Sequence, residues 1–119
     1  MIQLLRRIRP AAVAAVCFMA EPLAWAGGDS TANAIRELSN DDFRVRTQAA
    51  LALGSTKDAK VVQPLCSALS DPKSAVRAAA AAALGKLALG GEDCLSEREA
   101  KEQSDSVKAA IQKALVAVR

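Results

Sequence analysis

The residues of this chain whose types and spacing could do chemistry are few. Arg46, Arg77 and Lys108 recur at one constant separation along the sequence. A cation that recurs at one repeat position either pairs with acids of a neighbouring repeat or binds an external anion. We expect the first, a ladder in which these cations reach the loop acids Asp41 and Asp71 or helix carbonyls. An anion site is the alternative.

Two cysteines, Cys66 and Cys94, are the other reactive pair. A third, Cys17, lies in an N-terminal segment with the features of a removable signal. Its removal would leave an even number of cysteines in an oxidising compartment, so we predict a disulfide between Cys66 and Cys94. Two buried, inert thiols are the alternative. The spacing is not C-x-x-C, which favours a structural bond over a redox-active one.

Arrangements of side chains that catalyse reactions or bind metals are missing from the sequence. The 119 residues include no histidine, which removes the commonest general base and the commonest metal ligand. There is no G-x-S-x-G motif, no phosphate-binding loop and no calcium loop. We therefore expect a non-enzymatic protein with no cofactor and no bound metal.

The N-terminal segment, residues 1–26, is typical of a secretory signal peptide. Arg6, Arg7 and Arg9 precede an unbroken apolar run over residues 11–20, and Ala24-Trp25-Ala26 is a small-x-small cleavage site. The run is too short to span a bilayer, which takes about 20 apolar residues. An uncleaved N-terminal helix is the alternative. We expect cleavage after Ala26, a periplasmic or secreted location, and no membrane span in the mature chain.

Removal of this segment changes the charge of the chain. The whole sequence carries +3, whereas residues 27–119 hold 13 basic and 12 acidic side chains, a net charge of +1. That charge supplies no concentrated basic stripe for nucleic acid. Aromatic residues are 3% of the chain, too few to stack on single-stranded bases. We expect no nucleic-acid partner.

The mature chain, residues 27–119, is built of repeats. Residues 40–54 align with residues 71–85 and share a Val-Arg pair and a Leu-Gly pair. We call this displacement, which carries Arg46 onto Arg77 and Arg77 onto Lys108, the repeat shift. Apolar residues at i, i+4, i+7 and i+8 mark one stripe of a helix in each unit. The pattern predicts antiparallel helix pairs in units of about 31–57, 58–90 and 91–119. Because the third unit is highly charged at its start, we expect two and a half to three repeats.

Local signals indicate where the helices begin and end. Asp71 followed by Pro72 predicts an N-cap and a first helical residue, and Asn40 is the equivalent cap one unit earlier. Gly54 precedes a polar loop, so we expect it to end a helix. Gly85 is followed by further helix formers, so it either ends a helix or permits a close backbone contact.

The pattern D-x-x-x-x-V-R-x-x-A-A-x-x-L-G resembles the HEAT repeat, in particular the short HEAT-like repeats named after phycobilisome lyases. The matching residues are Asp41, Val45, Arg46, Ala49, Ala50, Leu53 and Gly54, then Asp71, Val76, Arg77, Ala80, Ala81, Leu84 and Gly85. The resemblance covers about residues 31–119 and is strongest up to Gly91. It implies an all-α fold, a short α-solenoid of stacked antiparallel helix pairs, and binding of other proteins rather than catalysis.

In HEAT-like arrays the second helices line the concave side, and there we expect the partner to bind. The residues outside the apolar stripe on that face are Arg44, Thr47, Gln48, Leu51, Ala78, Ala79, Ala82, Ala109 and Lys113. Such small side chains accept a helix, an extended peptide or a second copy of the chain. We expect an exported adaptor or scaffold that binds a protein. The alternatives are a self-associating structural fragment and an accessory subunit of a chromophore-lyase-like enzyme.

Overall fold

A computed structural model describes residues 30–119 of the chain. These residues form helices joined by short turns, with no strand among them. The expected signal peptide, residues 1–26, and its cleavage site lie outside the described residues, so both stay predictions. Within residues 30–119, no helix is long and apolar enough to cross a membrane.

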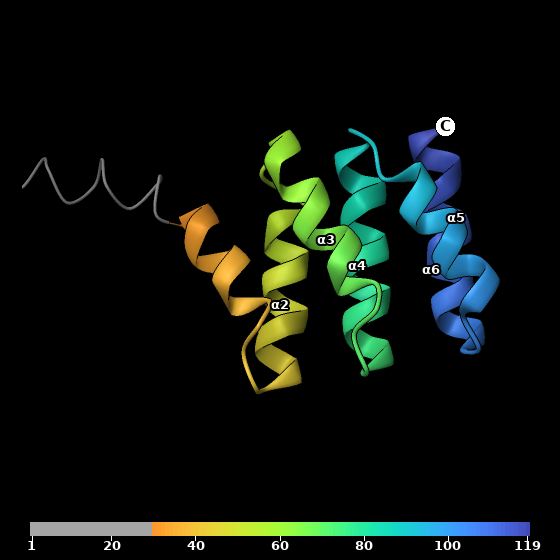
Figure 1. Cartoon of the computed structure of the whole chain (residues 1–119). Helices are drawn as coiled ribbons and strands as arrows, with labels where there is room; N and C mark the ends of the chain where they lie inside the picture. Colours follow the sequence, from red (N-terminus) through yellow and green to blue (C-terminus); the bar gives the residue numbers. More distant parts are fainter. Residues whose placement is uncertain (1–29) are drawn as a thin grey trace, which may run out of the picture. The chain divides into compact units, whose positions relative to one another are not determined.

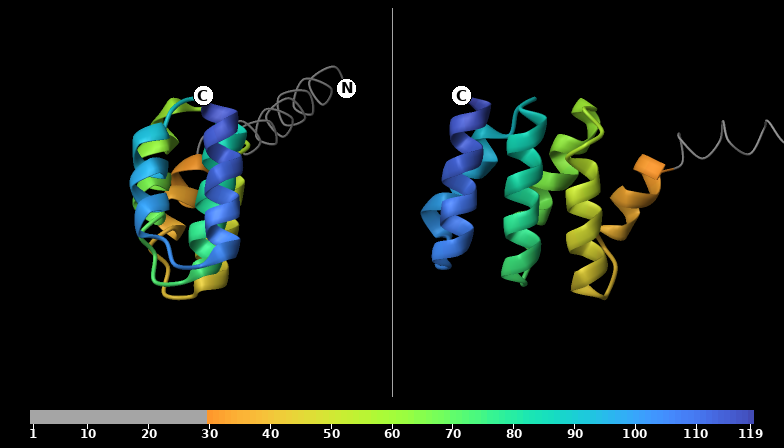
Figure 2. Two further views of the ribbon diagram at one scale, coloured as in Figure 1. Left: turned by 90° about the vertical axis from the view of Figure 1, so that its right-hand side faces the viewer. Right: turned by 180° about the vertical axis from the view of Figure 1, so that it is seen from behind.

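The described residues form three helix pairs, which are arranged in two layers (Figures 1 and 2). The second helices α2 (Phe43–Leu53), α4 (Ser74–Leu87) and α6 (Asp105–Val118) stand side by side. The first helices α3 (Val62–Ala68) and α5 (Glu92–Lys101) form the other layer, and a 3-10 turn, η1 (Ala59–Val61), leads into α3. A helix over residues 30–37 precedes α2. The predicted all-α solenoid is confirmed, with three complete pairs.

The charged first helix of the third unit, α5, is fully formed. Its acids Glu92 and Asp93 lie in the first turn and its bases Arg98 and Lys101 in the last turn. Negative charges at the start of a helix and positive charges at its end interact favourably with the helix dipole, and this stabilises a segment that has few apolar residues. Leu95 is its one buried residue, so α5 is held to the core by little apolar area.

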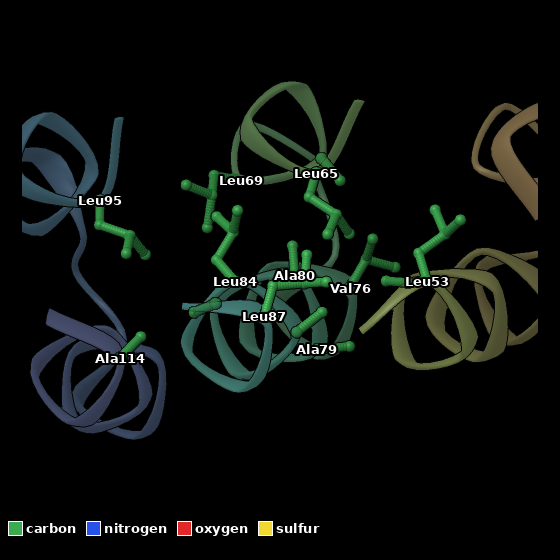
Figure 3. Close-up of a cluster of buried hydrophobic side chains, with 14 of the residues drawn as sticks. Leu53, Leu65, Leu69, Val76, Ala79, Ala80, Leu84, Leu87, Leu95 and Ala114 are labelled. Atoms are coloured by element: carbon green, nitrogen blue, oxygen red, sulfur yellow. The ribbon is translucent and has the colours of Figure 1, made fainter. Parts of the chain in front are cut away.

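The core lies between the two layers and consists of Leu, Val, Ile and Ala side chains. Leu65 of α3 and Leu69, the residue that caps it, point toward Val76, Ala80 and Leu84 of α4 (Figure 3), and all five are buried. The three residues of α4 belong to the stripe that the periodicity predicts, and the leucines of the preceding helix cover that apolar face.

Two glycines set how closely the second helices approach one another. A Cβ built on Gly54 would lie 2.9 Å from the Cα of Ala83, and one built on Gly85 would lie 2.9 Å from the Cα of Ala114. Such a separation admits only glycine. Gly54 ends α2 as predicted, while Gly85 lies inside α4 and makes the close backbone contact.

The starts of α2 and α4 differ from the prediction. The N-caps are Asp42 and Lys73, so Asn40 and Asp71 stand two residues earlier and Pro72 lies outside the helix. The Oδ1 atoms of Asn40 and Asp71 each accept a hydrogen bond, 2.9 Å long, from the N–H two residues ahead. This is an Asx turn, which competes with N-capping for the same side chain.

Candidate protein-binding surface

The repeated arginines form a ladder between units. Arg46 donates from Nε and Nη2 to the carboxylate of Asp71, at 2.7 and 3.0 Å. Arg77 donates in the same way to Glu102, at 2.8 and 3.1 Å. Both pairs are bidentate, the strongest geometry for a guanidinium and a carboxylate. The predicted ladder is confirmed for these two arginines, whose donors are thereby engaged within the fold.

Two of the predicted ladder residues, Asp41 and Lys108, differ from the prediction. Asp41 was expected as a ladder acid, but only its backbone carbonyl meets Arg46, at 3.1 Å, and its side chain is exposed. The repeat shift aligns Asn40, not Asp41, with Asp71, so the prediction was one residue out of register. Lys108 has no carboxylate partner within residues 30–119.

Glu102 is the ladder acid that the sequence prediction missed. The repeat shift aligns it with Asp71 and was the signal that could have found it. Its side chain is fully buried. Burial alone would raise the pKa of Glu102, but hydrogen bonds from Arg77 and the Ser104 N–H, with the charges of Arg77 and Arg98, lower that pKa to about 2. A carboxylate so held is a structural anion rather than a proton donor.

The cysteines connect the first helices of two adjacent units. Cys66 of α3 and Cys94 of α5 form a disulfide, with their Cα atoms 5.8 Å apart, which is within the usual range for this bond. The predicted pairing is confirmed. Because α5 buries only Leu95, the bond ties the least anchored of these helices to the array.

Most of the predicted partner-contact residues are accessible on the second helices. Arg44, Gln48, Leu51, Ala82, Ala109 and Lys113 are exposed, and Thr47 and Ala78 are half-buried. Leu51 retains 50% of its accessible area. Arg44 pairs with Asp42 of its own cap, at 3.4 Å, and the Thr47 hydroxyl donates to the carbonyl of Phe43, at 2.8 Å.

The prediction that Ala79 contacts a partner is wrong, because only 6% of its surface is exposed. It lies one turn before Ala83, the residue that receives Gly54 of α2. That glycine contact brings α2 close enough to cover Ala79 as well. The surface therefore excludes this position.

The surface is hollowed between α4 and α6. A groove of about 450 Å³ is lined by Ala82, Gly85, Lys86, Ala110, Lys113, Ala114 and Ala117. Its floor is made of small apolar residues, and its charged residues are Lys86 and Lys113. Lys86 donates from Nζ to the Ser55 hydroxyl at 3.1 Å, while Lys113 has no carboxylate partner in the described chain. The sequence prediction included Ala82 and Lys113 but missed Lys86.

A comparison with family models decides what kind of repeat this is. The model for HEAT repeats matches residues 31–116, a range that extends from the first helix pair into the last helix, α6. The chain belongs to the HEAT-repeat family. The match extends into the charged third HEAT unit, where the sequence resemblance is weakest. A search of curated proteins finds no match.

The groups on this HEAT array suit binding by shape and charge. Within residues 30–119, no group of three or more His, Cys, Asp or Glu side chains could hold a metal ion. Every buried side-chain nitrogen or oxygen of the described residues has a hydrogen-bond partner. HEAT repeats commonly mediate protein–protein interactions, and the groove between α4 and α6 is the feature of this surface that a partner segment could enter.

Proposed function

We propose that this chain is an exported, non-enzymatic HEAT module that binds a protein partner through its second helices, as an adaptor or scaffold. The observation that carries the proposal is the groove between α4 and α6. Its floor is apolar and is formed by alanines and Gly85, and two lysines are its charged groups. The site belongs to rigid helices, which lowers the entropic cost of binding.

The shape and charge of the groove favour one class of partner segment. Small residues along both walls allow a helix or an extended strand to approach the backbone closely. Lys86 and Lys113 add positive charge on either side, which favours acidic side chains in the partner and speeds encounter. The expected ligand is therefore a segment with small or apolar residues next to aspartate or glutamate.

Two features support export. The positive start, the apolar run and the Ala-x-Ala site of residues 1–26 form the pattern of a signal peptide. The bond between Cys66 and Cys94 is of a kind that persists in oxidising compartments and is rare in the cytosol. Intact-mass analysis of the protein recovered from cells tests this part: we expect a chain that begins at Gly27, and one that begins at Met1 would contradict export by cleavage.

The absence of a catalytic role is proposed on the chemistry of the available side chains. The sequence contains no histidine. The buried carboxylate, Glu102, is held ionised by Arg77 and Arg98, so it lacks the raised pKa of a general acid.

The binding surface is tested by charge reversal in the groove. Cross-linking in the native compartment should join the wild-type protein to its partner. The variant K86E/K113E should reduce the yield of that product by about tenfold or more, because two attractive contacts become repulsive. The variant K57E/K60E changes net charge equally at two exposed lysines that do not line the groove, and it should keep the full yield. Equal yields from both variants would reject the groove as the binding site.

A further inference from the structure

One face of each second helix points toward the following unit, and we call it the edge stripe. It consists of three residues spaced by four, which lie on one face of a helix. The edge stripes are Arg46, Ala50 and Gly54 in α2 and its C-cap, then Arg77, Ala81 and Gly85 in α4, then Lys108, Gln112 and Val116 in α6.

The edge stripes of α2 and α4 make the same contacts with the next unit. Each arginine forms a bidentate pair with an acid 25 residues ahead. Each glycine lies against an alanine of the next second helix, where a Cβ would approach the alanine Cα to 2.9 Å. Ala50 and Ala81, midway along the stripes, are fully buried. A unit thus contacts the next through an arginine and a glycine, and the alanine between them is buried.

All three residues of this stripe are changed in α6, which stands at one end of the array (Figure 1). Lysine replaces arginine at position 108 and loses the bidentate fork. Gln112, which is exposed, replaces the buried alanine. Val116, 78% exposed, replaces glycine. Valine carries a Cβ and two methyl groups at the position where even one Cβ is too close to the neighbouring helix.

The opposite edge of the array holds the residues that a second copy would present to α6. The repeat shift places Asn40 at the position of the ladder acids Asp71 and Glu102. The same shift places Ala52 at the position of Ala83 and Ala114, which receive the glycines. Head-to-tail docking in the repeat register would therefore place Val116 of one copy against Ala52 of the next. It would place Lys108 beside the neutral amide of Asn40.

We infer that α6 is a closing edge, on which a second copy of this chain cannot stack head to tail in the repeat register. The valine prevents the helices from approaching. The ladder pair is also missing, because Lys108 stands where the ladder has an arginine and Asn40 stands where it has a carboxylate. Head-to-tail contacts of this kind do not close on themselves and would build filaments. The three substitutions in α6, together with Asn40, therefore prevent α6 from accepting the α2 edge of a second copy. This inference does not depend on the groove between α4 and α6.

The inference is tested by restoring the contact. The variant N40D/K108R/Q112A/V116G rebuilds an edge stripe and its acid. Its weight-average mass in sedimentation should rise with concentration to roughly twice the monomer mass or more, while the wild-type mass stays constant over the same range. The matched control, N40D/K108R/Q112A/V116A, keeps one Cβ at position 116 and should stay monomeric. A restored variant that shows the wild-type helical circular dichroism and stays monomeric would overturn the inference.

A second measurement does not require the restored variant to fold. Ala52 is exposed, so the substitution A52E in the wild-type background should leave the mass unchanged at every concentration. A wild-type mass that rises with concentration, and that falls to the monomer value in A52E, would show that this edge does accept a second copy.

Discussion

Arg77 binds the carboxylate of Glu102 through two hydrogen bonds, at 2.8 and 3.1 Å, and the Glu102 side chain has no exposed surface. Arg98 and the N–H groups of Gln103 and Ser104 complete the set of donors around it. One carboxylate thus connects α4, α5 and the loop that leads into α6. This position is where the third unit is fastened to the second.

Substitution of Glu102 by glutamine should destabilise the fold. The amide keeps the size of the side chain but leaves two guanidinium groups without a charge partner. We expect a loss of about 2–3 kcal/mol in the free energy of unfolding, measured by urea denaturation. The control E97Q removes an exposed carboxylate from the same helix as Arg98 and should change stability by less than about 0.5 kcal/mol. Equal losses in the two variants would contradict the importance of the pair.

The contribution of Glu102 should depend on pH in a defined window. Its pKa is about 2 in the folded protein, against an ordinary value of 4.5. Between these values the unfolded chain binds more protons than the folded one, so stability falls as the pH falls. The stabilisation is fully present above pH 4.5 and is lost progressively as the pH approaches 2.

This dependence is measured as the difference in unfolding free energy between the wild type and E102Q along a pH series. The difference should be constant near neutral pH and should shrink steadily below pH 4.5. A difference that stays the same down to pH 2 would show that the ionisation of Glu102 does not stabilise the fold.

Loss of the disulfide should destabilise the array, and α5 first. The bond between Cys66 and Cys94 spans 28 residues, for which the entropy of loop closure corresponds to about 3–4 kcal/mol. The variant C66S/C94S should lose about this amount in thermal and urea unfolding. Hydrogen exchange should rise most in α5, which buries only Leu95. Dithiothreitol should lower the stability of the wild type but leave the double variant unaffected, and a change in both would point to another cause.

Substitution of Gly85 by alanine should destabilise the protein, although the same change usually stabilises a helix by about 0.5–1 kcal/mol. The added Cβ would lie 2.9 Å from the Cα of Ala114, so α4 and α6 would have to separate. We expect a net loss of about 1–3 kcal/mol in unfolding free energy. The sign of the change in unfolding free energy shows whether the close approach of α4 and α6 requires glycine at position 85. A more stable G85A variant would mean that the two helices do not approach this closely.

The features that the sequence by itself determines are periodic or local. The constant repeat shift, with its Val-Arg and Leu-Gly pairs, is sufficient to predict helix pairs, their order and the arginine ladder. The repeat shift predicts these features because each unit has to bury the same apolar face against the next unit. The sequence also indicates that Gly54 ends a helix, and it leaves a close backbone contact at Gly85 as one of two alternatives; the close approach at both glycines is seen only in the structure. The pairing of Cys66 and Cys94 is predicted from their even number in an oxidising compartment, and the structure supplies the Cα separation of 5.8 Å that permits it.

The features that only the tertiary structure decides depend on which atoms stand opposite a residue. The repeat shift marks the position of Glu102, but only the tertiary structure shows that its carboxylate is fully buried between Arg77 and Arg98, in a charged segment that has the composition of a solvated helix face. Ala79 is buried because a neighbouring helix covers it, which an alanine in an alanine-rich helix does not indicate. Asp71 stands before its helix, where it both accepts from Arg46 and closes an Asx turn. Local propensity records a residue's preference for a conformation, whereas burial and pairing depend on the shape of the neighbour.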